Sequence, residues 1–288
     1  MIPATMISLG NGGAFNGYLA MPASGSGPGL ILLHEIFGLN RHIRALAELY
    51  AEEGYVVLAP DLYWQQRPGI ELGYAREEIE AARECAARLG ERAIDDIGAA
   101  IVALRSNPSC NGKIGTLGFG LGGRLAWLTA MSVKIDAAVG YYPDAVGQHL
   151  EAAGPIGCPL ALHFAGDAES VSACEAIRQA LTDGDHFQIY LYPEAHRGFN
   201  NWERDVYERS AASLAQSRTL GLLRRTLGPR YDLDGLWERH ARCEFDLRDP
   251  DATMATMVAQ PYVNHVPTMT GGFGYDELRR FYANHFIP

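Results

Sequence analysis

One glycine-rich stretch in the middle of the sequence constrains what this chain can fold into. Ile114–Phe119 has the apolar character of a short buried strand, and Leu121–Met131 directly after it has the pattern of a helix. Between the two lie Gly118, Gly120 and Gly122. Glycines two residues on either side of a central position let the chain turn without side-chain clashes. The stretch therefore predicts a sharp strand-to-helix turn with Gly120 at its apex.

Apolar runs that alternate with helical stretches predict an α/β fold, with a mostly parallel sheet covered by helices on both faces. Such sheets place ligand sites beyond the carboxyl ends of the strands. The loops after Leu33, Phe119, Phe164 and Tyr192 are therefore the ones to examine. The expected strands are 15–21, 29–33, 55–58, 114–119, 135–142, 160–164 and 187–192, and the expected helices are 41–53, 75–105, 121–131, 173–182 and a segment after 202.

Length and charge limit the possible partners. The 288 residues suit one large domain and an addition. The net charge of −10 argues against nucleic acid and anionic membranes as partners, because it offers them no attraction. The sequence contains no signal-like N-terminus and no apolar run long enough to span a bilayer. We expect a cytoplasmic protein whose partner is a small molecule.

The cysteines predict no metal site. Cys85, Cys110, Cys158, Cys174 and Cys243 are scattered, odd in number and form no CxxC pair. They are interpreted as reduced structural thiols, and no spacing typical of metal ligands is visible elsewhere.

A boundary is predicted at Leu227-Gly228-Pro229. It divides the chain into a main domain, 1–228, and an extension, 229–288. An extension of this size is small for an independent core. We expect a C-terminal helical arm that packs on the main domain or on a partner subunit, which makes a homo-oligomer possible.

The motifs together resemble the dienelactone hydrolase (carboxymethylenebutenolidase) family of α/β-hydrolases over residues 10–226. The resemblance implies an α/β-hydrolase fold, hydrolysis of cyclic enol-lactones or related esters, a Cys–His–Asp triad, a Glu that controls the thiol, and no cofactor. The glycine turn then corresponds to the nucleophile elbow of that fold. The matching segments are 34–40 (HEIFGLN), 60–63 (PDLY), 111–115 (NGKIG), 121–123 (LGG), 138–142 (AVGYY), 192–195 (YPEA) and 198–199 (GF).

The resemblance does not transfer the triad. The nucleophile position falls on Gly120, the acid position on Ala168 and the base position on Arg197. One-residue shifts in loops would instead bring Asp167 and His196 together as acid and base. Because all three positions differ, natural loss of the nucleophile is favoured over an engineered replacement.

Other parts of the site do carry over by resemblance. Glu35 stands at the position of the thiol-controlling Glu, and Tyr142 at a position that lines the substrate pocket. The oxyanion hole of this fold is built from backbone N–H groups, here those of Ile36 and Leu121. Leu121 also begins a helix, whose N-terminus favours negative charge. Backbone donors do not depend on the lost side chain.

Further candidates come from loop residues. Arg197 and Arg67 are candidates for holding a substrate carboxylate through two parallel hydrogen bonds. Trp64 is a candidate for lining the pocket. The alternatives are that these arginines are simply exposed and that the tryptophan packs in the core.

The extension resembles the start of an NTF2-like/SnoaL-type domain through Trp237, residues 261–265 and residues 271–275. Either the chain is truncated or this segment serves as a structural arm. The leading hypothesis is a protein that binds a small carbonyl, lactone or carboxylate compound and hydrolyses it, if at all, without an acyl-enzyme. The alternatives are an inactive assembly module and a proton-transfer enzyme, an isomerase or cyclase, that uses Glu35.

Overall fold

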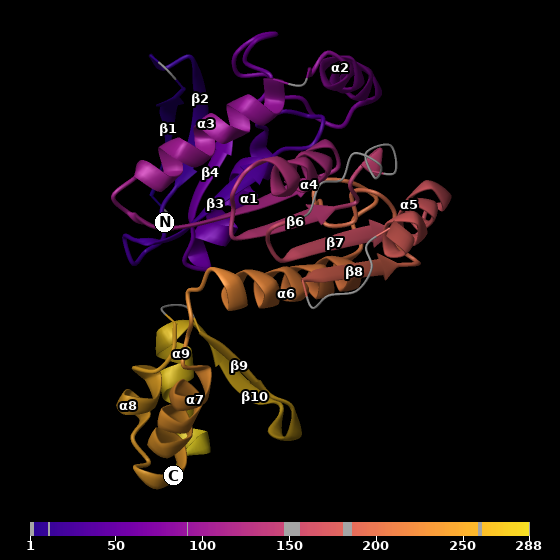
Figure 1. Cartoon of the computed structure of the whole chain (residues 1–288). Coiled ribbons are helices and arrows are strands. Elements are labelled where there is room, and N and C mark those ends of the chain that lie inside the picture. Colours follow the sequence, from indigo (N-terminus) through magenta and orange to yellow (C-terminus); the bar gives the residue numbers. More distant parts are fainter. Residues whose placement is uncertain are drawn as a thin grey trace. The chain divides into compact units, whose positions relative to one another are not determined.

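The computed structural model of the chain describes residues 3–10, 12–90, 92–146, 156–180, 186–258 and 261–287. The chain divides into two compact units, Met1–Pro229 and Arg230–Pro288, one residue from the boundary predicted by the sequence (Figure 1). Each unit is described by itself below.

The first unit is built on an eight-stranded sheet in the order β1-β2-β4-β3-β5-β6-β7-β8. Strands β4, β3, β5, β6, β7 and β8 run parallel, while β2 is antiparallel to both β1 and β4. The mostly parallel sheet predicted from the sequence is confirmed. The strands are β1 (Ala4–Leu9), β2 (Phe15–Ala20), β3 (Gly27–Leu33), β4 (Val56–Pro60), β5 (Cys110–Phe119), β6 (Ala137–Tyr141), β7 (Leu160–Ala165) and β8 (Phe187–Tyr192).

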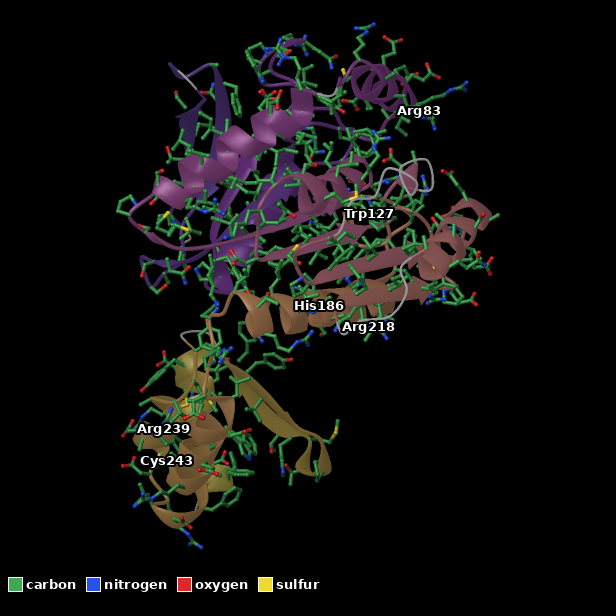
Figure 2. All side chains as sticks on the ribbon, in the orientation of Figure 1. Arg83, Trp127, His186, Arg218, Arg239 and Cys243 are labelled. Carbon is green, nitrogen blue, oxygen red and sulfur yellow. The ribbon has the colours of Figure 1, made fainter. Side chains whose placement is uncertain are left out.

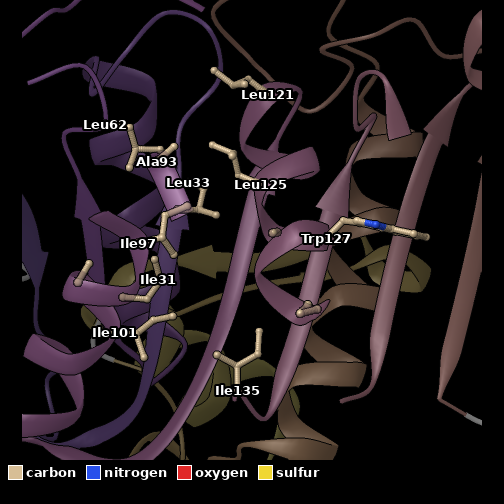
Figure 3. Packing of buried hydrophobic residues seen from close by; sticks show 14 of the residues in the cluster. Ile31, Leu33, Leu62, Ala93, Ile97, Ile101, Leu121, Leu125, Trp127 and Ile135 are labelled. Carbon is tan, nitrogen blue, oxygen red and sulfur yellow. The ribbon is translucent and has the colours of Figure 1, made fainter. Parts of the chain in front are cut away.

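Helices cover both faces of this sheet (Figure 1). Helices α3, α4 and α5 bury apolar side chains in one layer, and α1 and α6 bury theirs in the other. Figure 3 shows the first layer, where Ile31 and Leu33 of β3 lie among side chains of α3 and α4. The helices are α1 (Arg41–Glu52), α2 (Arg76–Ala87), α3 (Arg92–Ser106), α4 (Leu121–Ser132), α5 (Ala168–Ala180) and α6 (Arg209–Thr226).

Two differences from the sequence prediction have physical reasons. Strand β1 was not predicted, because it is an edge strand with mostly exposed side chains and has no clear apolar alternation. Helix α5 begins at Ala168, earlier than the expected start near residue 173. Asp167 accepts a hydrogen bond from the backbone N–H of Ser170 and so caps the first turn of α5.

The second unit has a small apolar core of its own. Its buried members are Met254, Leu278, Phe281, Tyr282 and Ile287. Besides helices it contains an antiparallel pair of strands, which the prediction of a helical arm did not include. Its elements are α7 (Leu233–Ala241), η2 (Arg242–Asp246), α8 (Pro250–Met254), β9 (Tyr262–His265), η3 (Val266–Thr268), β10 (Thr270–Phe273), α9 (Gly274–Phe281) and η4 (Tyr282–Phe286).

Candidate functional site

The turn between β5 and α4 has the geometry of an elbow. Gly120 has φ 53° and ψ −114°, a backbone conformation that residues other than glycine adopt only under strain. A Cβ on Gly122 would lie 2.2 Å from the carbonyl oxygen of Leu33. On Gly120 a Cβ would meet nothing closer than Tyr142 Cε2, at 3.8 Å. The frame of the elbow therefore requires glycine at 122, whereas the space above Gly120 is open.

A cavity of about 410 Å³ lies over this elbow. Its size is within the range of small-molecule sites. Gly120 and Leu121 form part of its wall, Glu35 and Ile36 come from the loop after β3, and Tyr142 follows β6. Parallel strands whose carboxyl ends meet at one edge of the sheet explain why these distant residues converge. Further lining comes from helix α2 and from the loop after β8.

Glu35 is buried in this cavity and held by three partners. Tyr142 Oη donates to Glu35 Oε1 at 3.2 Å, and Asn201 Nδ2 donates to Oε2 at 3.2 Å. Arg204 Nη1 lies 3.9 Å from Oε1. Burial raises the pKa of Glu35 above its usual value, although Arg204, Asn201 and Tyr142 oppose the shift. A carboxylate with a raised pKa is a stronger base than an exposed one.

Tyr142 stays a neutral phenol beside this carboxylate. Burial, and next the charge of Glu35, raise the pKa of Tyr142 well above its usual value. Its hydroxyl also lies 2.5 Å from Asn200 Oδ1. The single phenolic proton can be donated to only one of the two acceptors at a time.

Two residues in the wall of the cavity, Ile36 and Leu121, have a backbone N–H group without an acceptor among the described residues. In the described part of the chain, the N–H of Ile36 donates to nothing, while its carbonyl accepts from Tyr63 Oη at 3.0 Å. Leu121 is the first residue of α4, so its N–H has no acceptor within the helix. Together they have the composition of the predicted oxyanion hole.

His34 fixes the loop that presents Ile36. Its Nε2 accepts from the backbone N–H of Leu62 at 3.3 Å, so Nδ1 carries the proton and donates to the carbonyl of Glu35 at 2.6 Å. Burial lowers the pKa of His34, and the ring is therefore neutral.

Three arginines line the cavity, of which sequence reasoning named one. Arg197 Nη2 lies 3.3 Å from Glu169 Oε1, and its Nε lies 3.7 Å from Asp167 Oδ2. Arg204 stacks on the rings of Phe37 and Tyr74 as well as pairing with Glu35. Arg83 projects from α2 with an exposed side chain and has no ion pair among the described residues (Figure 2). The only sequence signal for Arg204 and Asn201 was that they directly follow the Gly198–Phe199 motif.

The expected acid–base pair does not form. His196 has an exposed side chain outside the cavity lining, and within the described residues no hydrogen bond or ion pair joins it to Asp167. Asp167 instead accepts from Ser170 Oγ at 2.8 Å and pairs with Arg197. Burial raises the pKa of Asp167, but the bonds from Ser170 and the charge of Arg197 outweigh it and lower that pKa overall. The prediction fails because Asp167 is used to cap helix α5.

Two substrate-binding candidates also lie elsewhere. Trp64 Nε1 donates to Asp96 Oδ2 at 2.9 Å, and its ring stacks on Phe15 with centroids 5.7 Å apart. Arg67 is exposed and makes no ion pair with any described residue. Neither lines the cavity. The alternative interpretations, core packing and simple exposure, hold for these two.

Comparison with known proteins identifies the family to which this chain belongs. The sequence profile described as the dienelactone hydrolase family matches residues 15–227. This chain belongs to the dienelactone hydrolase family. A carboxymethylenebutenolidase of Pseudomonas putida is 34% identical over 222 residues, covering 74% of this chain and 92% of the relative. Carboxymethylenebutenolidase 1 of Cupriavidus pinatubonensis is 30% identical over 224 residues, covering 75% of this chain and 94% of the relative.

Solved structures support the fold. A dienelactone hydrolase from Anabaena variabilis aligns with a TM-score of 0.61 and 18% identity, covering 79% of this chain and 99% of its own. A dienelactone hydrolase-like promiscuous phosphotriesterase from metagenomic libraries aligns with a TM-score of 0.63 and 21% identity over the same shares. The predicted α/β-hydrolase fold is confirmed. The family match ends at residue 227, and the likeness of the extension to an NTF2-like domain stays a prediction.

The described part of the chain contains no cluster of metal ligands and brings no cysteine to the cavity. No group of three or more His, Cys, Asp or Glu residues there could hold a metal ion. All five cysteines are free, and none lines the cavity. No helix in the described ranges is long and apolar enough to cross a membrane.

Proposed function

We propose that the cavity binds a small anionic carbonyl compound, such as a lactone or ester that carries a carboxylate. Three arginines line it, against the two carboxyl groups of Glu35 and Asp144. Asp144 is already engaged, with its Oδ1 3.5 Å from Arg124 Nε. Of the three arginines, Arg204 pairs with Glu35 and Arg197 pairs with Asp167 and Glu169, so only Arg83 has no ion pair among the described residues. Arg83 is the arginine that suits a carboxylate, which guanidinium groups bind with paired hydrogen bonds. Membership of the dienelactone hydrolase family agrees with a lactone-like ligand.

We further propose that water, and no side chain, attacks the carbonyl carbon. The carboxylate of Glu35 accepts a proton from the water as its oxygen forms the new C–O bond. The resulting oxyanion accepts hydrogen bonds from the N–H groups of Ile36 and Leu121. When the intermediate collapses, the old C–O bond breaks and the proton on Glu35 passes to the leaving oxygen. Glu35 thus returns to its starting state.

One observation carries this proposal. The position above Gly120 is open, and it belongs to the same cavity as Glu35 and as Ile36 and Leu121, whose N–H groups have no acceptor among the described residues. That space is where the side chain of a covalent nucleophile would stand, and we place the attacking water in it.

The test is hydrolysis of enol-lactones and aryl esters by the purified protein and by Glu35→Gln. We expect slow turnover that survives alkylation of the cysteines and is lost in the variant. Turnover abolished by alkylation would show that a cysteine is the nucleophile and would refute the proposal. Unchanged turnover in Glu35→Gln would equally refute the assigned role of Glu35.

A second candidate function, proton transfer, is favoured by the pairing of a buried base with donors that suit an enolate. Here Glu35 would remove a proton from the carbon next to the carbonyl and return it to another carbon. Nuclear magnetic resonance in D₂O separates the two functions. Deuterium entering the substrate without ring opening indicates proton transfer, while ring opening without exchange indicates hydrolysis.

A further inference from the structure

A second hollow, of about 170 Å³, opens between helices α1 and α6. We call it the aromatic groove, because five aromatic side chains line it. They are Tyr50, Phe119, Tyr141, Trp202 and Tyr207. It shares no lining residue with the cavity over Gly120.

Its lining carries no charge but does carry polar groups. Asn200 is 8% exposed, and its Oδ1 lies 2.5 Å from Tyr142 Oη. Its Nδ2 donates to nothing in the described part of the chain. Gln216 and Ser213 also line the groove and have no side-chain partner among the described residues. An amide donor in the wall of the groove that has no protein acceptor can donate to a ligand that supplies an oxygen.

The volume of the groove limits the size of the ligand that it can hold. A cavity of about 150 Å³ with apolar walls holds one benzene molecule, so this groove has room for one ring and a small substituent. Aromatic walls favour an aromatic ring over a saturated one. The absence of charge in the lining disfavours an ionic ligand, which would lose its hydration without gaining a counter-ion.

The groove and the Glu35 cavity share one loop. Residues 199–208 form a closed loop, in which the N–H of Glu208 donates to the carbonyl of Phe199 at 2.9 Å. Trp202 and Tyr207 of this loop line the groove, while Arg204 lines the Glu35 cavity.

We propose that the aromatic groove binds a neutral single-ring aromatic compound that carries one hydroxyl or carbonyl oxygen. The ring lies among the aromatic side chains, and the oxygen accepts a hydrogen bond from Asn200 Nδ2. The simplest probe is phenol. Its dissociation constant is expected to be on the order of 1 mM, which is within the binding efficiency that very small ligands reach.

The test uses a matched pair of variants in α6. Ser213 and Ser217 are both exposed on this helix, but only Ser213 lines the groove. Titration of phenol, followed by ligand-observed nuclear magnetic resonance, should show binding weakened at least about tenfold by Ser213→Trp, since the new side chain fills the groove. Ser217→Trp should leave the dissociation constant unchanged. Equal effects of the two substitutions, or none from Ser213→Trp, would place phenol elsewhere and overturn the proposal.

Two further comparisons test the chemistry. Phenol should bind about threefold to tenfold more tightly than cyclohexanol, because only phenol offers a ring to the aromatic walls. Asn200→Ala should weaken phenol binding about fivefold and leave toluene binding unchanged. Circular dichroism of each variant confirms that it is folded. Absence of saturable phenol binding to the wild-type protein, or a loss for toluene equal to that for phenol, would contradict the proposal.

Discussion

The substitution Gly122→Ala should destabilise the first unit severely, although alanine is the better helix former. Gly122 lies in helix α4, where alanine is favoured over glycine by about 1 kcal/mol. The added Cβ would lie 2.2 Å from the carbonyl oxygen of Leu33 and 2.6 Å from that of His34. Ordinary contacts of this kind begin near 3.4 Å, so α4 must move away from the end of β3 by about an ångström in a close-packed interior. We expect a net cost above the ~1–3 kcal/mol of ordinary overpacking.

Two other glycines serve as controls for this substitution. A Cβ on Gly98 of helix α3 would meet nothing within 4 Å. Gly98→Ala should therefore stabilise the unit by about 0.5–1 kcal/mol. Gly120→Ala meets no clash but places alanine at φ 53°, so it should cost about 1–3 kcal/mol.

Thermal unfolding followed by circular dichroism measures all three. For a unit of this size each kcal/mol shifts the melting temperature by about 2–4 °C. The expected order of melting temperature is Gly98→Ala, then wild type, then Gly120→Ala, then Gly122→Ala. A Gly122→Ala protein at least as stable as Gly120→Ala would refute the elbow geometry on which the site depends.

Four further predictions concern the cavity. Burial raises the pKa of Glu35 on folding, so the neutral carboxylic acid favours the folded state. This contribution to stability is fully present below the pKa that Glu35 has in the unfolded chain, and it is lost as the pH rises through the pKa that Glu35 has in the folded protein. The wild type should thus lose stability relative to Glu35→Gln as the pH rises, and parallel melting curves across pH would contradict this. Arg204→Met removes a positive charge that lowers the pKa of Glu35, so the carboxylate form, and with it the activity, should appear at a higher pH than in the wild type. A pH profile of activity that does not move would show that Arg204 does not act on Glu35. Gly120→Cys should be acylated once by an aryl ester, seen by mass spectrometry, without multiple turnovers from the new thiol, because no histidine is among the described residues that line the cavity and Asp167 pairs with Arg197. Rapid multiple turnover that alkylation abolishes would disprove that arrangement. His196→Ala should leave turnover unchanged, since the side chain is exposed outside the cavity, and a large fall in kcat would reinstate it as a base.

Parts of the site were predictable because they depend on the backbone or on local sequence. The glycine elbow follows from local sequence, and the resemblance to the dienelactone hydrolase family assigned Glu35, Ile36 and Leu121 to the same site. They come from loops after strands whose ends a parallel sheet brings to one edge. The open space over Gly120 follows from the missing side chain.

Other parts depended on where single loops and helices begin. Asp167 was free to serve as an acid in the sequence, but the early start of α5 turned it into a helix cap. The sequence made Trp64 a candidate for lining the pocket, but in the structure its ring stacks on Phe15 and its N–H donates to Asp96. The contacts of Trp64 join segments far apart along the chain, whereas the cap by Asp167 is local, since Ser170 lies three residues after it, and the sequence prediction overlooked it.

By itself the sequence determined the α/β class and the sharp glycine turn after β5, because periodicity and glycine placement are local properties of the chain. Only the tertiary structure decided which groups surround Glu35, since Arg204, Asn201 and Tyr142 reach it from segments more than a hundred residues away in the sequence. Burial in that contact set is what raises the pKa of Glu35, and burial is a property of the fold as a whole. The same holds for the aromatic groove, whose walls come from α1, α6, two strand ends and one loop.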